Sequence, residues 1–236
     1  MGAAEYDGIQ PPQPWHSRPP LASKVASLAG ITLVLGLRCA HSQESSEPPP
    51  LPGESINAPA TITQDFVTSV RLGSESIVLE ETGLDSLRLR LGAGLIRQRG
   101  DAASSLEWLC VHAATGENRW LLWLESGEMA AGTVNRFHVL AVPSAASIDR
   151  RCSSLSARSG TIELPGRVAL GLSASALRQL LGQPSAVAGD TLVYHYSRHV
   201  IDSKVSGGEY YIDTMLCVVM THGRVVQIAG WRATTS

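Results

Sequence analysis

The chain has 236 residues, a formal net charge of −2, 44% hydrophobic residues and 17% charged residues. This length and hydrophobic content are enough to bury a core in one or two domains. Contacts to phosphate groups need clustered Lys and Arg, so the balanced charge disfavours a nucleic-acid partner and predicts no membrane contact beyond an N-terminal anchor.

Residues 1–42 have the features of a secretory signal peptide. Arg18 and Lys24 precede an apolar run at residues 25–37, and small residues follow, with Ser42 as the expected last residue of the signal. The run is short for a bilayer span, but an uncleaved signal anchor is an alternative. The pattern therefore predicts a periplasmic or secreted protein, or one anchored to a membrane through this segment.

Cys39 raises the alternative of a bacterial lipoprotein signal, which ends directly before the lipidated cysteine. A large charged residue, Arg38, precedes Cys39 and departs from the small-residue pattern of such signals. The sequence therefore favours cleavage over lipidation. The intact mass of the protein from cells distinguishes the two, because cleavage leaves Gln43 as the first residue, whereas lipidation leaves a diacylated Cys39.

Residues 43–60 predict a disordered linker. They include five prolines and three glutamates and almost no large apolar side chains. Such a segment buries too little surface to offset the entropy lost on ordering, and its prolines favour an extended, semi-rigid geometry. We expect a spacer between the N-terminal segment and the folded part of the chain.

Two stretches of the chain share one pattern, which indicates an internal duplication. Residues 87–92 (LRLRLG) correspond to residues 177–182 (LRQLLG), and a Gly-Leu step precedes each. In both halves the predicted helix is followed by three apolar strands with polar turns between them. Agreement of the whole element order is stronger evidence of a repeat than the short matching strings are.

The pattern predicts an α+β fold of two similar units, each a short helix packed on a small antiparallel β-meander. The first unit spans residues 61–150 and the second spans residues 160–236, with a loop rich in Ser, Ala and Arg at residues 144–159 between them. Each helix would cover the apolar face of its meander. Because one unit buries little surface alone, we expect the two to pack side by side.

Residues 165–232 contain a helix that opens with Gly-Leu-Ser at 171–173 and ends in Leu-Gly-Gln-Pro at 181–184, and Tyr194 lies in the following strand. This pattern resembles the SmpA/OmlA (BamE-type) envelope family, and its tandem duplication is similar to the architecture of the β-lactamase inhibitor protein. The first copy, residues 80–142, matches more loosely. The resemblance implies an envelope-located binding or assembly module rather than an enzyme.

Ser173 and Gly182 mark the two ends of the second predicted helix. A serine directly before a helix accepts a hydrogen bond from a free backbone N–H, so Ser173 is expected to be the N-cap. Gly182 suits the left-handed residue that closes a helix. Residues 171–175 (GLSAS) only approximate the motif around a nucleophilic serine, and the cap role accounts for Ser173 without catalysis.

Three cysteines follow the predicted signal. Cys110 lies within a predicted strand and Cys152 lies just past the last strand of the first unit, so we predict a disulfide between them, although an odd number of cysteines permits other pairings. The bridge would contribute about 4 kcal/mol in the loop-entropy model. Cys217 lies in an apolar run and is expected to be a buried free thiol.

The histidines do not predict a metal site. His195 and His199 have the spacing of metal ligands on a helix, but they lie in a predicted strand and no third ligand is evident. His112 alternates with Trp108 and Cys110 along one strand and is expected to be an ordinary, partly buried histidine. We therefore predict no metal, no cofactor and no catalytic residue.

Aromatic side chains of the second half are the strongest candidates for a binding surface. Tyr and Trp bury a large area at a small entropic cost, so they serve both in cores and at protein interfaces. The candidate interface residues, which surround a predicted loop at residues 202–208 or lie in the last strand, are Tyr196, Tyr210, Tyr211 and Trp231.

The leading hypothesis is an exported, non-enzymatic envelope protein that binds another envelope or extracellular protein. The alternative is a small-ligand-binding protein or an enzyme with a site between the two units. The polar groups of such a site would be His112, His195, His199 and Glu209.

Overall fold

The computed structural model describes residues 43–101, 104–115, 118–155, 162–202 and 208–236. These residues belong to one compact unit. The predicted signal peptide and Cys39 lie outside the described residues. Within the described residues, no helix has the length and apolar character needed to cross a bilayer.

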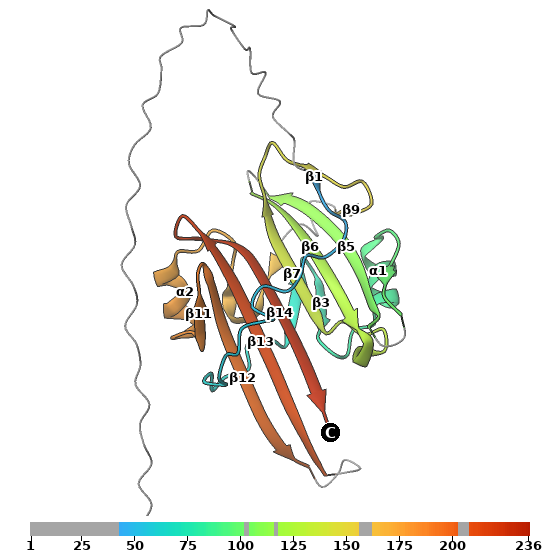
Figure 1. Cartoon of the computed structure of the whole chain (residues 1–236). Helices are drawn as coiled ribbons and strands as arrows, with labels where there is room; N and C mark the ends of the chain where they lie inside the picture. Colours follow the sequence, from blue (N-terminus) through green and yellow to red (C-terminus); the bar gives the residue numbers. More distant parts are fainter. Residues whose placement is uncertain (1–42, 102–103, 116–117, 156–161, 203–207) are drawn as a thin grey trace, which may run out of the picture. The chain divides into compact units, whose positions relative to one another are not determined.

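A nine-stranded sheet organises the described part of the chain. The strand order along the sheet is β11-β12-β13-β14-β7-β6-β5-β4, all pairs being antiparallel, and β9 adds a short parallel pairing to β5 (Figure 1). The strands are β4 (Arg97–Arg99), β5 (Leu106–Thr115), β6 (Asn118–Gly127), β7 (Arg136–Val142), β9 (Ser153–Ser154), β11 (Ala186–Ala188), β12 (Thr191–Ile201), β13 (Glu209–Thr221) and β14 (Arg224–Thr235).

The prediction of an α+β fold built from two helix-on-meander units was wrong. The structure is mostly β, and its two halves share one sheet because β7 pairs with β14, in register from Arg136↔Trp231 to Leu140↔Gln227. In the described residues only α1 (Leu84–Leu91) and α2 (Ala174–Leu181) are α-helices. Pairing β7 with β14 satisfies backbone groups that two separate meanders would leave at open edges.

Local sequence explains where α2 begins and ends. The Ser173 side chain accepts a hydrogen bond from the backbone N–H of Ala176 at 3.2 Å, so the predicted N-cap is confirmed. Leu177 and Leu181 are buried on the side that faces the sheet. Gly182 ends the helix with a φ of 81°, although its ψ of −157° lies outside the left-handed helical region expected for it.

One face of the sheet, here called the helix face, carries the largest apolar cluster. Cross-strand partners share a face, and the buried row Leu109, Leu124, Phe137 and Gly230 runs across four strands on this side. Both helices and a small sheet contribute side chains to the same cluster. That sheet and its neighbouring turns comprise β2 (Ser69–Leu72), β3 (Glu75–Val78), β10 (Ile162–Glu163), η1 (Glu128–Ala130) and η2 (Pro165–Arg167).

The opposite face is crossed by residues 45–60, here called the strap, which is drawn in blue in Figure 1. The carbonyl oxygen of Ser46 accepts hydrogen bonds from the indole N–H groups of Trp108 (2.9 Å) and Trp123 (3.2 Å). At the other end, the carbonyl oxygen of Ala58 lies 2.7 Å from Nδ1 of His195. This face is the strap face.

The strap differs from the disordered spacer that its composition predicts. Ser46, Pro48 and Ala58 are buried, although the segment offers few large apolar side chains. Two buried indole N–H groups need acceptors, and the Ser46 carbonyl supplies one acceptor for both. Proline-rich chain is already extended, so less conformational entropy is lost when it lies along a sheet.

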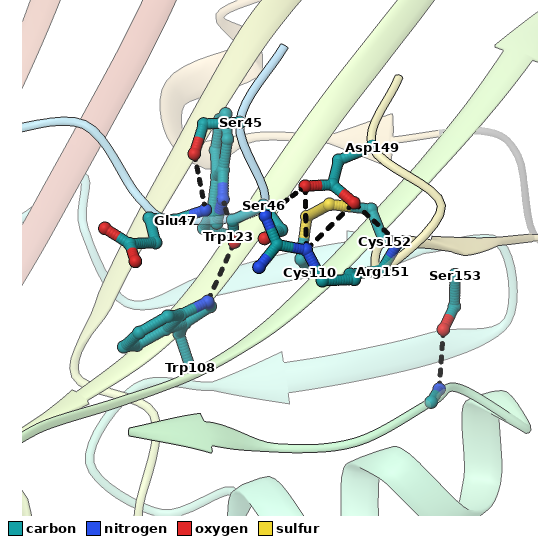
Figure 2. The surroundings of a disulfide bond; sticks show 11 residues. Ser45, Ser46, Glu47, Trp108, Cys110, Trp123, Asp149, Arg151, Cys152 and Ser153 are labelled. Carbon is teal, nitrogen blue, oxygen red and sulfur yellow. Dashed lines mark hydrogen bonds and ion pairs between the residues drawn. A yellow bond between two sulfur atoms is a disulfide. The ribbon is translucent and has the colours of Figure 1, made fainter. Parts of the chain in front are cut away.

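The predicted disulfide between Cys110 and Cys152 is confirmed, with the two Cα atoms 4.7 Å apart. Figure 2 shows the bridge beside the two tryptophans that bind the strap. It indicates a non-cytoplasmic compartment, because thiols in the cytosol are kept reduced. The bridge also holds the segment with β8 (Ser147–Ile148), which pairs with β1 (Gln43–Glu44) directly before the strap.

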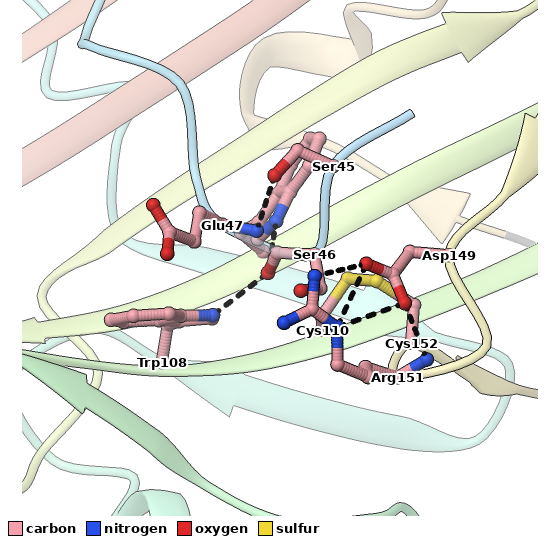
Figure 3. A network of polar contacts seen from close by, with 9 residues as sticks. Ser45, Ser46, Glu47, Trp108, Cys110, Asp149, Arg151 and Cys152 are labelled. Atoms are coloured by element: carbon pink, nitrogen blue, oxygen red, sulfur yellow. Dashed lines mark hydrogen bonds and ion pairs between the residues drawn. A yellow bond between two sulfur atoms is a disulfide. The ribbon is translucent and has the colours of Figure 1, made fainter. Parts of the chain in front are cut away.

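Asp149 and Arg151 close the turn that leads to Cys152. The guanidinium of Arg151 contacts both carboxylate oxygens of Asp149, at 2.5 to 3.0 Å (Figure 3). Hydrogen bonds from Arg151 hold the pKa of the Asp149 carboxyl well below its usual range. The charged pair therefore fixes the turn beside the disulfide.

Candidate functional site: the outer edge of strand β12

Strand β12 is covered along only part of its outer edge. Strand β11 pairs with Thr191, Leu192 and Val193. Ser185 donates its N–H to the Val193 carbonyl at 2.7 Å, and its hydroxyl accepts from the N–H of His195 at 3.0 Å. The carbonyl of His195 accepts from the N–H of Ile62 at 3.1 Å, where the chain passes around the edge.

Beyond His195 the outer edge of β12 is open in the described part of the chain. Val193 and His195 direct their backbone groups away from β13, and the register with β13 continues without a shift. Because the strand repeats every two residues, Ser197, His199 and Ile201 also direct an N–H and a C=O outward. No described group binds these three pairs.

The side chains at this end of the hairpin include exposed apolar groups. Ile201 is 74% exposed and Tyr211 is 50% exposed. The imidazole of His199 stacks on the Tyr211 ring with centroids 4.6 Å apart, and its Nε2 lies 3.2 Å from a carboxylate oxygen of Glu209. These contacts hold Tyr211 in place beside the open edge, which lowers the entropy that it would lose in an interface.

The four aromatic residues predicted to form an interface do not share one surface. Tyr211 and Trp231 lie on the strap face, whereas Tyr196 and Tyr210 lie on the helix face, as their cross-strand partners show. Trp231 is further along the sheet, where it lines a cavity together with Leu51 of the strap. The three tyrosines therefore lie near the open edge, Tyr211 on the strap face and Tyr196 and Tyr210 on the helix face. Trp231 lies away from this edge.

The polar residues of the alternative site are not brought together. His112 lies on β5, where burial and the charge of Arg119 lower its pKa. His195 and His199 are four residues apart on β12, a separation of about 13 Å along a strand. Each has its own partner, the Ala58 carbonyl for His195 and Glu209 for His199. The described residues contain no group of three potential metal ligands.

Cys217 is buried and free, as predicted. Burial raises the pKa of its thiol to about 12, so the reactive thiolate is scarce at neutral pH. Gly53 of the strap covers it, since a Cβ atom added at Gly53 would lie 3.0 Å from the Cys217 sulfur. Cys217 has the surroundings of a structural residue.

Two features were missed by reasoning from the sequence. The first feature is the open edge of β12. Its position is set by the point at which β11 stops pairing with β12, and no local sequence pattern shows that point. The second feature is Glu125, an acidic residue that ends the apolar run RWLLWLE and is buried on the strap face. An acidic residue at the end of an otherwise apolar strand was the available signal.

No protein-family model, curated protein or solved structure matches this chain.

Proposed function

We propose that the protein is an exported, non-enzymatic binding module that receives an extended segment of another envelope or extracellular protein along the open edge of β12. The observation that carries this proposal is the set of three outward-facing backbone pairs, those of Ser197, His199 and Ile201. An added strand would satisfy all three pairs with main-chain hydrogen bonds.

The edge lacks the features that usually block strand addition. Natural edge strands are protected by proline, by bulges or by cover from other elements. The exposed stretch of β12 has no proline and no bulge, and its only fully charged side chain is Arg198. Each added main-chain hydrogen bond contributes roughly 1 kcal/mol net, so the exposed apolar groups Ile201 and Tyr211 would provide much of the remaining affinity.

The side chains of β12 indicate the chemistry of the partner segment. Arg198 and Val200 lie on the helix face, and Ile201 lies on the strap face. A segment with an acidic residue opposite Arg198 and apolar residues opposite Val200 and Ile201 would complement both faces. Arg198 would lie close to its own copy in antiparallel self-pairing centred on it, which favours a different protein over a second copy.

Export to the periplasm or the extracellular space is part of the proposal. The disulfide supports a compartment outside the cytoplasm, and residues 1–42 have the sequence features of a secretory signal peptide. The resemblance of residues 165–232 to the SmpA/OmlA (BamE-type) family, a hypothesis based on sequence alone, implies the same location and the same kind of role.

The test is photo-crosslinking in cells with a photoreactive residue at position 199 of the tagged chain, followed by mass spectrometry of the crosslinked species. We expect one recurrent partner, captured by wild-type and Ser197→Ala chains but not by Ser197→Pro. Proline removes only an outward N–H at this edge position, whereas alanine keeps it. A photoreactive residue at Arg224, the first residue of β14, is the control position.

Thermal unfolding of Ser197→Pro and Ser197→Ala must first agree to within a few degrees. If Ser197→Pro unfolds early, Ile201→Lys replaces it, because an exposed lysine at the edge also opposes strand addition. Capture that is equal in the blocked and unblocked chains, or crosslinks to a second copy alone, would contradict the proposal.

A further inference from the structure

A row of charged and aromatic side chains crosses the strap face of the sheet. Arg97, Trp108, Glu125, Arg136 and Trp231 are successive cross-strand partners on β4, β5, β6, β7 and β14. They therefore lie side by side on one face, under or beside the strap. Glu125 is the central member and the only acid of the row.

Glu125 is buried, and one of its carboxylate oxygens has no hydrogen-bond partner in the described structure. The residue is 2% exposed, and the oxygen without a partner is Oε1. Burial raises the pKa of its carboxyl to about 7, although the charges of Arg136 and Arg99 act to lower it. A buried, unpartnered carboxylate is costly, so the neutral acid, which is a hydrogen-bond donor, is substantially populated at physiological pH.

Glu125 faces a cavity of about 340 Å³ between the sheet and the strap. Pro49, Pro50 and Leu51 of the strap form one wall, and Leu106 contributes an apolar patch from β5. The guanidinium groups of Arg99 and Arg136 line the same cavity, and neither forms an ion pair with a described carboxylate. The volume is at the lower end of the range for small-molecule sites.

We propose that this cavity binds a small organic carboxylate. The ligand carboxylate lies between the guanidinium groups of Arg99 and Arg136 and accepts a hydrogen bond from the carboxyl group of Glu125. Its apolar part packs against Pro50, Leu51 and Leu106. Binding would give the carboxyl group of Glu125 and the guanidinium groups of Arg99 and Arg136 charge-assisted hydrogen-bond partners.

Arg99 and Arg136 favour an anion over a cation beside Glu125. Arg99 and Arg136 would repel a bound ammonium group, whereas they pair with a carboxylate. The other titratable groups that line the cavity are Glu54 of the strap and Glu128 of η1, both exposed, and the charge of Glu54 acts to raise the pKa of Glu125. His138 lies on the same face outside the cavity lining, and burial lowers its pKa so that it is neutral at physiological pH. Inorganic phosphate would leave the apolar wall without contacts.

Proton linkage follows from the hydrogen bond that Glu125 donates. The ligand needs the protonated form of Glu125, so binding is accompanied by uptake of a proton and weakens as the pH rises through about 7. From the protonated fraction alone, affinity at pH 6 should exceed affinity at pH 8 by about tenfold. The site is separate from the open edge of β12, so it does not depend on the proposed partner.

Calorimetric titration of the purified full chain with acetate, butyrate and hexanoate at pH 6 and pH 8 tests the proposal. We expect hexanoate to bind more tightly than acetate because of the apolar wall. Glu125→Gln, which keeps a donor without an ionisable group, should bind with an affinity that differs less than about twofold between the two pH values. Arg136→Met should weaken binding by at least about tenfold.

Butylamine and inorganic phosphate are the ligand controls, and Glu163→Gln, an exposed change on β10, is the matched protein control. The unfolding transition of each variant is measured first, and Arg99→Met replaces Arg136→Met if the latter does not fold. The proposal is overturned if the folded wild type binds no carboxylate at millimolar concentration, if butylamine binds better than butyrate, or if the arginine variant binds hexanoate as tightly as wild type.

Discussion

Glu125 lies directly opposite Arg136 on the neighbouring strands β6 and β7, yet the two side chains form no ion pair. The arginine charge lowers the pKa of Glu125, but burial raises it by more, to about 7. A carboxyl group that titrates near neutral pH is therefore buried on the strap face. Most carboxyls opposite an arginine would instead stay ionised down to acid pH.

The folded state should lose stability as the pH rises from about 4.5 to about 7. Folded Glu125 retains its proton up to about 7, whereas the unfolded chain releases it near 4.5, so the folded state binds more protons in this window. The loss amounts to roughly 3 kcal/mol. Urea unfolding of wild type and Glu125→Gln across pH 4 to 8 measures it. Equal slopes in the two proteins would show that Glu125 titrates normally.

His138 should act in the opposite direction. Its side chain is fully buried, and burial lowers its pKa from 6.5 to about 4, so the unfolded chain binds more protons between these values. Stability from this residue is lost as the pH falls from about 6.5 to about 4, again by roughly 3 kcal/mol.

The two effects oppose each other between pH 4.5 and 6.5, so single variants are needed to separate them. In Glu125→Gln only the effect of His138 remains, so this variant should lose stability as the pH falls. His138→Gln, which keeps a polar group beside Gln227, should expose the loss with rising pH that Glu125 causes. If wild type and both variants show the same dependence of the unfolding free energy on pH, Glu125 and His138 do not have these opposing effects.

Removal of the disulfide should destabilise the protein by about 4 kcal/mol, because the bridge closes a loop with a sequence separation of 42 residues. The double variant Cys110→Ser, Cys152→Ser is compared with oxidised wild type in urea. Cys217→Ala is the matched cysteine control; it keeps the bridge, so reductant should destabilise it as much as it destabilises wild type, whereas the double variant should not respond to reductant. A reduced wild type that is as stable as the oxidised form would show that the bridge contributes little.

Gly53→Ala should loosen the strap over Cys217. Gly53 has a φ of 84°, and an added Cβ atom would lie 3.0 Å from the Cys217 sulfur and 3.1 Å from Val193. We expect a loss of about 1 to 3 kcal/mol and faster reaction of Cys217 with a thiol reagent.

The matched control for this change is Gly171→Ala. Gly171 has a similar φ of 83°, but no atom lies within 4 Å of an added Cβ atom, so it reports backbone strain without crowding. It should lose some stability but leave the labelling rate of Cys217 unchanged. Equal labelling rates in Gly53→Ala and wild type would mean that the strap does not protect the thiol.

Features that depend on neighbouring residues or on simple pair chemistry could be predicted from the sequence. The Ser173 cap needs only its own backbone geometry and the N–H of Ala176, three residues away. The pairing of Cys110 with Cys152 followed from their positions relative to predicted strands, and burial of Cys217 followed from the apolar residues around it.

Tertiary structure alone decided how the two halves join and what the strap does. A helix on a meander is locally consistent whether β7 pairs with β14 or remains an edge, and only the register of residues about 90 positions apart chooses between them. Burial of Glu125 and the binding of Ser46 to Trp108 arise from the same long-range packing. The open edge of β12 is likewise a property of the assembled sheet, because it exists where β11 and Ile62 stop covering the strand.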